Sequence, residues 1–288
     1  MKLSEYRQLV SSLSDEQKTA MLIDLYKRQD KGGKILVETI AECLKDKKDL
    51  PEMKAYIPKF TVVNKEVAKF REWVLISSGW YYTRNSRKHK AMGRSILKEI
   101  STVPPQAKEA YLHALEIEKE MFDLCCLSES REFPWMNAFE MLGTTRSDRY
   151  RRICQMSFEN GYSVDVIREL ITFTCSGYYT DLFEVLEELE IFCTFLKNGD
   201  LRFEVLELCE NMFRQLGCPL PANRASFDEN HKTHILYGLA VLYMLLDSQE
   251  TDESTAKEDL ENLTSPAFLR RFYPALVASR KALDLRYM

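Results

Sequence analysis

Six basic side chains occur between residues 84 and 98, with no acidic residue among them: Arg84, Arg87, Lys88, Lys90, Arg94 and Lys98. Three aromatic residues, Trp80, Tyr81 and Tyr82, stand just before this run. Cations beside flat rings are the residue types that neutralise phosphates and stack bases. The basic run is therefore a candidate site for nucleic acid or another polyanion. The alternatives are a solvated helix face and internal ion pairs, and the net charge of −4 favours these alternatives.

Acidic side chains dominate residues 163–213, where eleven Asp and Glu stand against three Lys and Arg. Glu184, Glu187 and Glu188 lie at the centre of this stretch and form a candidate docking surface for a basic partner. The alternative is a solvated outer face. A smaller basic group, around Arg146 and Arg149, stands near the start of a predicted helix. Because cations there oppose the helix dipole, we expect acidic neighbours to pair with them.

His231 and His234 are spaced to lie on one helical face, which is an arrangement that can hold a metal ion. They lack the HExxH pattern and a third ligand, so they are a weak metal candidate, and we predict no metal or other cofactor. The sequence contains no GxSxG, GxGxxG or Walker phosphate-binding motif. We therefore assign no catalytic residue.

The elements that must position these side chains are helices. Apolar residues between residues 182 and 196 follow the i, i+3, i+4 spacing of one helical face, and Gly199 is expected to end that helix. Similar spacing recurs along the chain, while the best strand candidate is residues 60–63. We predict an all-α fold of roughly a dozen helices, stacked as antiparallel hairpins in a helical-repeat-like array or a multi-helix bundle. Residues 71–83 also align without gaps on residues 168–180, through either a repeat or coincidence.

The 288 residues are expected to form a single elongated all-α unit over residues 1–288. Within it we mark a candidate N-terminal subdomain at residues 1–62 and a C-terminal helical segment at residues 228–288, after a linker at residues 219–227. The longest apolar stretch, residues 235–246, is too short to span a bilayer and predicts a buried helix. The start of the chain lacks a signal-peptide pattern, so we expect a cytoplasmic protein whose eight scattered cysteines are reduced.

The opening residues LSEYRQLVSSLSDEQKTAMLIDLYKR contain a capping box, Ser14 to Gln17, and a helix that ends in Leu-Tyr-Lys. This segment resembles the start of an uncharacterised family of small bacterial helical proteins. The resemblance covers about a tenth of the chain. It implies a helical beginning and brings no function or site residue with it.

These patterns together predict a protein-interaction or scaffolding module. Its main partner is expected to be another protein, a homodimer is also considered, and no membrane partner is expected. The alternative is a nucleic-acid or polyanion-binding protein that uses the basic run, and a helical enzyme ranks third.

Overall fold

The structure is a computed structural model that describes residues 13–28, 57–76, 82–130, 138–177, 182–216, 227–250 and 253–287, with a few single positions between residues 11 and 41. The chain divides into two compact units, Met1–Ala55 and Tyr56–Met288. The boundary falls before residue 62, and residues 228–288 belong to the second unit. Residues 219–226 of the proposed linker lie outside the described part.

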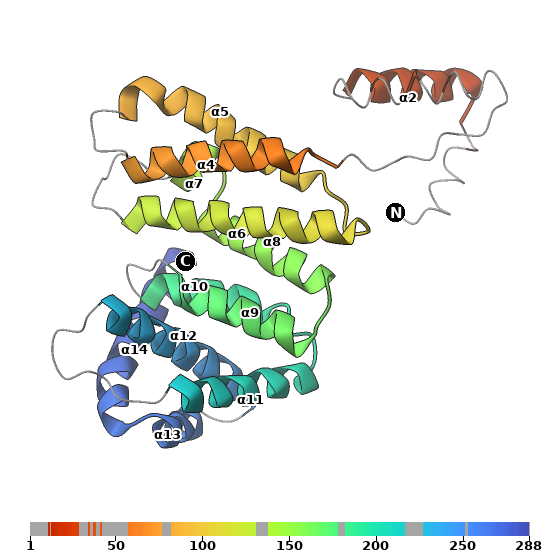
Figure 1. Ribbon diagram of the computed structural model, residues 1–288. Coiled ribbons are helices and arrows are strands. Elements are labelled where there is room, and N and C mark those ends of the chain that lie inside the picture. Colours follow the sequence, from red (N-terminus) through yellow and green to blue (C-terminus); the bar gives the residue numbers. More distant parts are fainter. Residues whose placement is uncertain are drawn as a thin grey trace. The chain divides into compact units, whose positions relative to one another are not determined.

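Twelve helices occupy the described residues, with no strand among them, which confirms the all-α prediction (Figure 1). The first unit contains α2 (Asp15–Arg28). The second unit contains α4 (Phe60–Ile76), α5 (Tyr82–Ser101), α6 (Lys108–Ser130), α7 (Ala138–Leu142), α8 (Arg146–Glu159), α9 (Val164–Cys175), α10 (Leu182–Cys193), α11 (Gly199–Leu216), α12 (Phe227–Glu250), α13 (Glu253–Leu263) and α14 (Pro266–Tyr287).

Helix α2 begins as its sequence predicts. The Ser14 hydroxyl accepts a hydrogen bond from the Gln17 amide at 3.2 Å, and the Gln17 side chain accepts one from the Ser14 amide at 2.9 Å. This reciprocal pair is the capping box, and it satisfies two backbone donors that a helix start leaves open.

The strand candidate at residues 60–63 is wrong, because these residues form the first turn of α4. The Lys59 carbonyl accepts hydrogen bonds from the amides of Val62 and Val63. Val63 begins a helical stripe that continues at Val67, Phe70 and Val74, all of which are buried. Helical spacing over about three turns therefore outweighs the strand preference of two adjacent valines.

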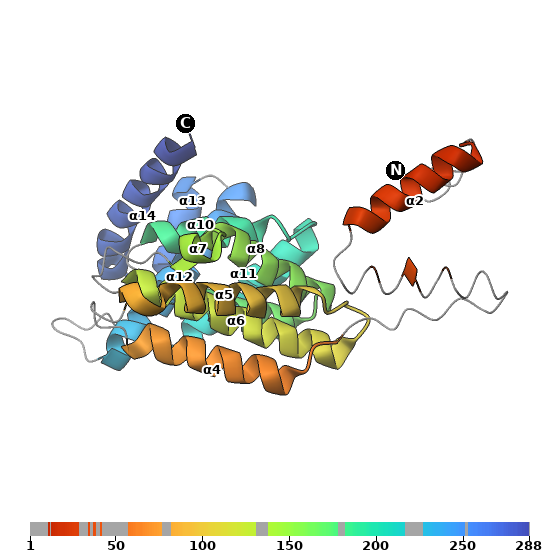
Figure 2. The ribbon, with the colours of Figure 1, turned by 90° about the horizontal axis from the view of Figure 1, so that it is seen from above.

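Three helices of the second unit, α4, α6 and α9, run in the same direction. Asn64 contacts His113 and Arg71 contacts Glu120, and both pairs are 49 residues apart. Between α6 and α9, Lys119 and Glu169 are 50 residues apart, and the neighbouring rings of Phe122 and Phe173 are 51 residues apart. When the contacting residues of two helices keep a constant difference in residue number, the helices are parallel. In an antiparallel pair, the sum of the two residue numbers would stay constant instead. The helices α5 and α8 return the chain between them, and Figure 2 shows the same elements from above.

Helix α12 lies at the centre of the second half and packs against α9, α10, α11 and α13. Leu239, Ala240, Val241 and Leu242 are fully buried, which agrees with the predicted core helix. Gly238 lets α12 approach α9 closely, because a Cβ there would lie 2.7 Å from the Cys175 sulfur. No helix in the described ranges has both the length and the apolar content required for a membrane span.

The boundary between α10 and α11 differs from its prediction. Helix α10 ends at Cys193, and Gly199 begins α11 instead of ending the helix before it. The Asn198 side chain caps α11 by accepting a hydrogen bond from the Leu201 amide at 2.9 Å. The pair Asn198-Gly199 therefore starts a helix, whereas Gly143 and Gly161 follow α7 and α8 with the positive φ angles that favour glycine.

Candidate functional site

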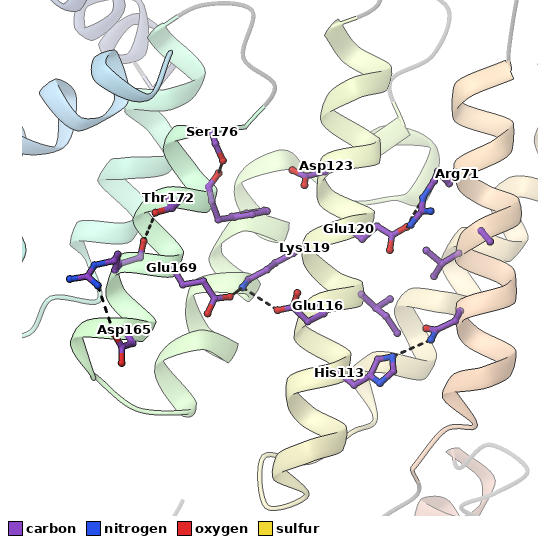
Figure 3. A pocket seen from close by; sticks show the side chains of 16 residues that line it. Arg71, His113, Glu116, Lys119, Glu120, Asp123, Asp165, Glu169, Thr172 and Ser176 are labelled. Atoms are coloured by element: carbon purple, nitrogen blue, oxygen red, sulfur yellow. Dashed lines mark hydrogen bonds and ion pairs between the residues drawn. The ribbon is translucent and has the colours of Figure 1, made fainter. Parts of the chain in front are cut away.

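An open groove crosses the three parallel helices α4, α6 and α9 and has a volume of about 960 Å³ (Figure 3). Each helix contributes residues at helical spacing. They are Asn64, Val67, Ala68 and Arg71 on α4, His113, Glu116, Ile117, Lys119, Glu120 and Asp123 on α6, and Asp165, Arg168, Glu169, Thr172, Phe173 and Ser176 at α9 and its C-terminal cap. We refer to this site as the α4–α6–α9 groove.

Ion pairs connect the walls of the groove to its centre. The Arg71 guanidinium binds the Glu120 carboxylate, and the Lys119 ammonium binds Glu169 and lies 3.3 Å from Glu116. Lys119 is 8% exposed because it stands between α6 and α9 and lies 5.8 Å from the centre of the Phe173 ring. These pairs link α4 to α6 and α6 to α9 across the groove.

Two stacked rings lie at the end of the groove where Figure 3 shows His113. The His113 ring stacks on Phe60 with 4.3 Å between ring centres, and one of its nitrogens lies 3.2 Å from the Asn64 amide nitrogen. His113 thereby links the second turn of α6 to the first two turns of α4. The contact orients the imidazole along the wall of the groove.

Asp123 lies towards the other end of the groove and differs from the other carboxylates. Among the residues that the structure describes, it forms no hydrogen bond or ion pair. Partial burial and the nearby Glu120 carboxylate raise the pKa of Asp123 to about 6, against the opposing effect of Arg146 and Lys119. Among the described residues, Asp123 is therefore a groove carboxylate without a hydrogen-bond or ion-pair partner, in a partly desolvated place.

The basic run on α5 is divided between packing and exposure. Arg94 donates a hydrogen bond from Nε to the Leu142 carbonyl at 3.1 Å, so it caps the last turn of α7. Arg87, Lys88 and Lys98 are exposed and Lys90 is half-buried, while the Arg84 side chain lies outside the described part. Within that part, Arg87, Lys88 and Lys90 form no ion pair.

The sequence places three aromatic rings, those of Trp80, Tyr81 and Tyr82, beside the basic run. Trp80 and Tyr81 lie outside the described residues, as does the side chain of Tyr82. His89, inside the run, stacks on the buried Trp73 with 4.7 Å between ring centres. This imidazole is thus part of the contact between α4 and α5.

The acidic docking candidate needs correction, because its central residues face the interior. Glu188 is 1% exposed and Glu187 is 7% exposed. Arg146 lies 2.6 Å from Glu188 and 3.0 Å from Glu184, and Ser147 donates a hydrogen bond to Glu187. These three carboxylates bind side chains of α8, so Glu187 and Glu188 cannot form an exposed docking surface.

We refer to Arg146 and its three carboxylates, Glu129, Glu184 and Glu188, as the Arg146 centre. The guanidinium also lies 5.8 Å from the centre of the Phe122 ring. The nearby Arg149 binds the buried Glu118, whose pKa is raised by burial and lowered in opposition by Arg149. The expectation that this small basic group pairs with acidic neighbours is confirmed.

Metal binding receives no support from the described residues, which contain no group of three suitable ligands. His234 is exposed on α12, and the side chain of His231 lies outside the described part. Comparisons with models of protein families, with curated proteins and with solved structures find no match to this chain.

The groove was not identified from the sequence. Glu116, Lys119, Glu120 and Asp123 share one face of α6, and this charged face was a usable signal. It becomes a site only because α4 and α9 lie on either side of α6, and about 50 residues separate these elements along the chain. The gap-free alignment of residues 71–83 on 168–180 pairs Arg71 with Arg168. In the structure these two arginines lie on opposite walls of the groove.

Proposed function

We propose that the chain is a protein-interaction module whose α4–α6–α9 groove receives a segment of a partner protein. The observation that carries this proposal is the groove itself, which spans three helices and combines apolar and charged lining. Stacked helical hairpins commonly use such extended surfaces to bind other proteins.

The dimensions of the groove suit a short segment. Its α6 residues run from His113 to Asp123, which corresponds to about 15 Å along a helix. A stretch of that length accommodates about four or five residues of extended chain. Val67, Ile117 and Phe173 offer apolar contacts, and the charged side chains around them can fix register and orientation.

A blocking substitution tests this function. Random peptides displayed on phage are selected on the full chain, and binding of the selected peptides is then measured on two variants. Ala68→Trp places a large ring on the exposed α4 wall of the groove, while Ala91→Trp places the same ring on an exposed position of α5 outside it. We expect Ala68→Trp to abolish binding and Ala91→Trp to leave it unchanged. Equal binding to both variants would reject the groove as the docking site.

A second candidate function is polyanion binding by α5, favoured by the absence of ion pairs at Arg87, Lys88 and Lys90 among the described residues. Its test is the binding of single-stranded oligodeoxythymidine at increasing salt. The variant Arg87→Glu with Lys88→Glu should lose binding. The matched variant Arg270→Glu with Arg271→Glu, which changes two adjacent exposed cations on α14, should retain it. Loss in both variants, or no binding by the unmodified chain, would reject this candidate.

A further inference from the structure

We infer that the segment bound in the α4–α6–α9 groove carries a lysine or arginine whose cationic end binds the Asp123 carboxylate. This inference rests on the proposed function and deepens it, because it names the chemistry that the groove selects. The partner is accordingly a basic-apolar segment of another protein.

The first argument is charge matching within the groove. Five carboxylates and three Lys or Arg cations line it. Four of the carboxylates have a cation within ion-pair distance: Glu116 and Glu169 beside Lys119, Glu120 beside Arg71, and Asp165 beside Arg168. Asp123 is the carboxylate left over, so a bound cation would complete the pairing.

The second argument is the shape around Asp123. Phe173 lines the same groove, and its ring lies 5.9 Å from the ring of Phe122, the residue before Asp123 on α6. A lysine or arginine side chain is a long apolar stem with a charged end. The stem can lie along the Phe173 ring while the charged end reaches the carboxylate, and Figure 3 shows Asp123 and Ser176 at the same end of the groove.

The third argument is electrostatic. Partial desolvation makes an ionised carboxylate costly, and a hydrogen-bonded cation offsets that cost more strongly there than it would in water. The charged groups near Asp123 are Lys119 and Glu120 on α6, Arg71 on α4, Arg146 on α8, and Arg168 and Glu169 on α9. Lys119 and Arg146 are held by other carboxylates, which leaves Asp123 able to accept from a ligand.

The test uses peptides selected on the full chain by phage display, with affinity measured by fluorescence anisotropy. We expect the selected sequences to share one Lys or Arg beside apolar residues. Asp123→Asn should weaken their binding at least about tenfold at neutral pH, since a charge-assisted pair is lost. Asp259→Asn, a half-exposed aspartate on α13 outside the groove, should leave binding unchanged.

A pH series adds a second readout. Because the pKa of Asp123 is about 6, the carboxylate is mostly protonated at about pH 5, and binding by the unmodified chain should fall up to about tenfold between about pH 7.5 and about pH 5. Asp123→Asn should remove this dependence. A peptide in which the conserved cation is replaced by glutamine should show the same low affinity for both proteins.

The outcomes separate the two proposals. If Ala68→Trp does not block the peptides, the groove is not the docking site and both proposals fail. If Ala68→Trp blocks them but the peptides share no cation, or Asp123→Asn binds them as well as the unmodified chain does, the groove function stands and the role of Asp123 is rejected.

Discussion

The Arg146 centre and the α4–α6–α9 groove are both built from charged side chains on or beside α6, yet their carboxylates are used differently. In the Arg146 centre, one cation lies within 3.6 Å of three carboxylates, and Glu188 is almost completely buried. In the groove, the ion pairs are partly exposed and Asp123 has no partner among the described residues.

The difference indicates how the two regions contribute. The Arg146 centre joins α6, α8 and α10 through buried charges that are paired and hydrogen-bonded, so removing its cation should strongly destabilise the protein. A carboxylate kept without a partner in a partly desolvated groove costs stability and gains nothing inside the chain. A cation bound in the proposed way would offset this cost.

The largest effect is expected for Arg146→Ala. The substitution leaves Glu184 and Glu188 without their cation, and removing one partner of a buried pair costs about 3–5 kcal/mol of unfolding free energy. Urea denaturation measures it. Arg168→Ala, which removes an exposed arginine 4.0 Å from Asp165, should change the unfolding free energy by less than about 0.5 kcal/mol. Similar values for the two variants would contradict the comparison.

Asp123→Asn should stabilise the protein at neutral pH. The folded pKa of about 6 lies above the unfolded value, so ionisation opposes folding, and stability falls as the pH rises from about 4 to about 6. The shift corresponds to about 3 kcal/mol, which solvent screening reduces to roughly 1–2 kcal/mol. Urea titrations should therefore show a gain for the variant at about pH 7 that disappears near pH 4. A loss of stability at pH 7 would show that Asp123 is satisfied inside the chain.

An intermediate case is Arg286→Ala. Arg286 lies 3.0 Å from the buried Glu187, but its own side chain is 57% exposed and Ser147 also donates to Glu187. We expect a cost of about 1 kcal/mol in urea denaturation, since Glu187 keeps its other donor. A cost as large as that of Arg146→Ala would place α14 within the same buried network.

The smallest effect is expected for the groove pair Arg71 and Glu120. Both side chains are partly exposed, so a double-mutant cycle with alanine should give a coupling of about 0.2–1 kcal/mol that decreases at high salt. The single variants measure any effect outside the pair. A coupling above about 2 kcal/mol would mean that the groove walls are held as rigidly as the Arg146 centre.

The fold class was predictable because each helix has its own stripe of apolar residues at helical spacing. The apolar spacing in α10 and the cap at Ser14 depend on neighbours within a few positions, and the Ser14 cap forms as predicted. The boundary at Asn198-Gly199 was misassigned because glycine can end one helix or begin the next, and the choice depends on where the cap side chain binds.

The site was less predictable because it depends on tertiary contacts. The acidic stretch at residues 163–213 was read as a surface, but α8 and α14 bring Arg146 and Arg286 against its glutamates. Charge counting along the chain cannot separate Glu188, which is buried, from the neighbouring exposed Glu190. The groove required the parallel alignment of α4, α6 and α9, which no local pattern encodes.

Because Gly238 contacts Cys175, the reactivity of this thiol can report the separation of α9 and α12. Cys175 is fully buried, and no atom could be added between it and Gly238 without moving α12. Burial also raises the pKa of its thiol, so little reactive thiolate forms at rest. An alkylating reagent can therefore reach this sulfur only when helices around it separate, α9 and α12 among them. In excess reagent, the labelling rate of Cys175 would report how often that interface opens.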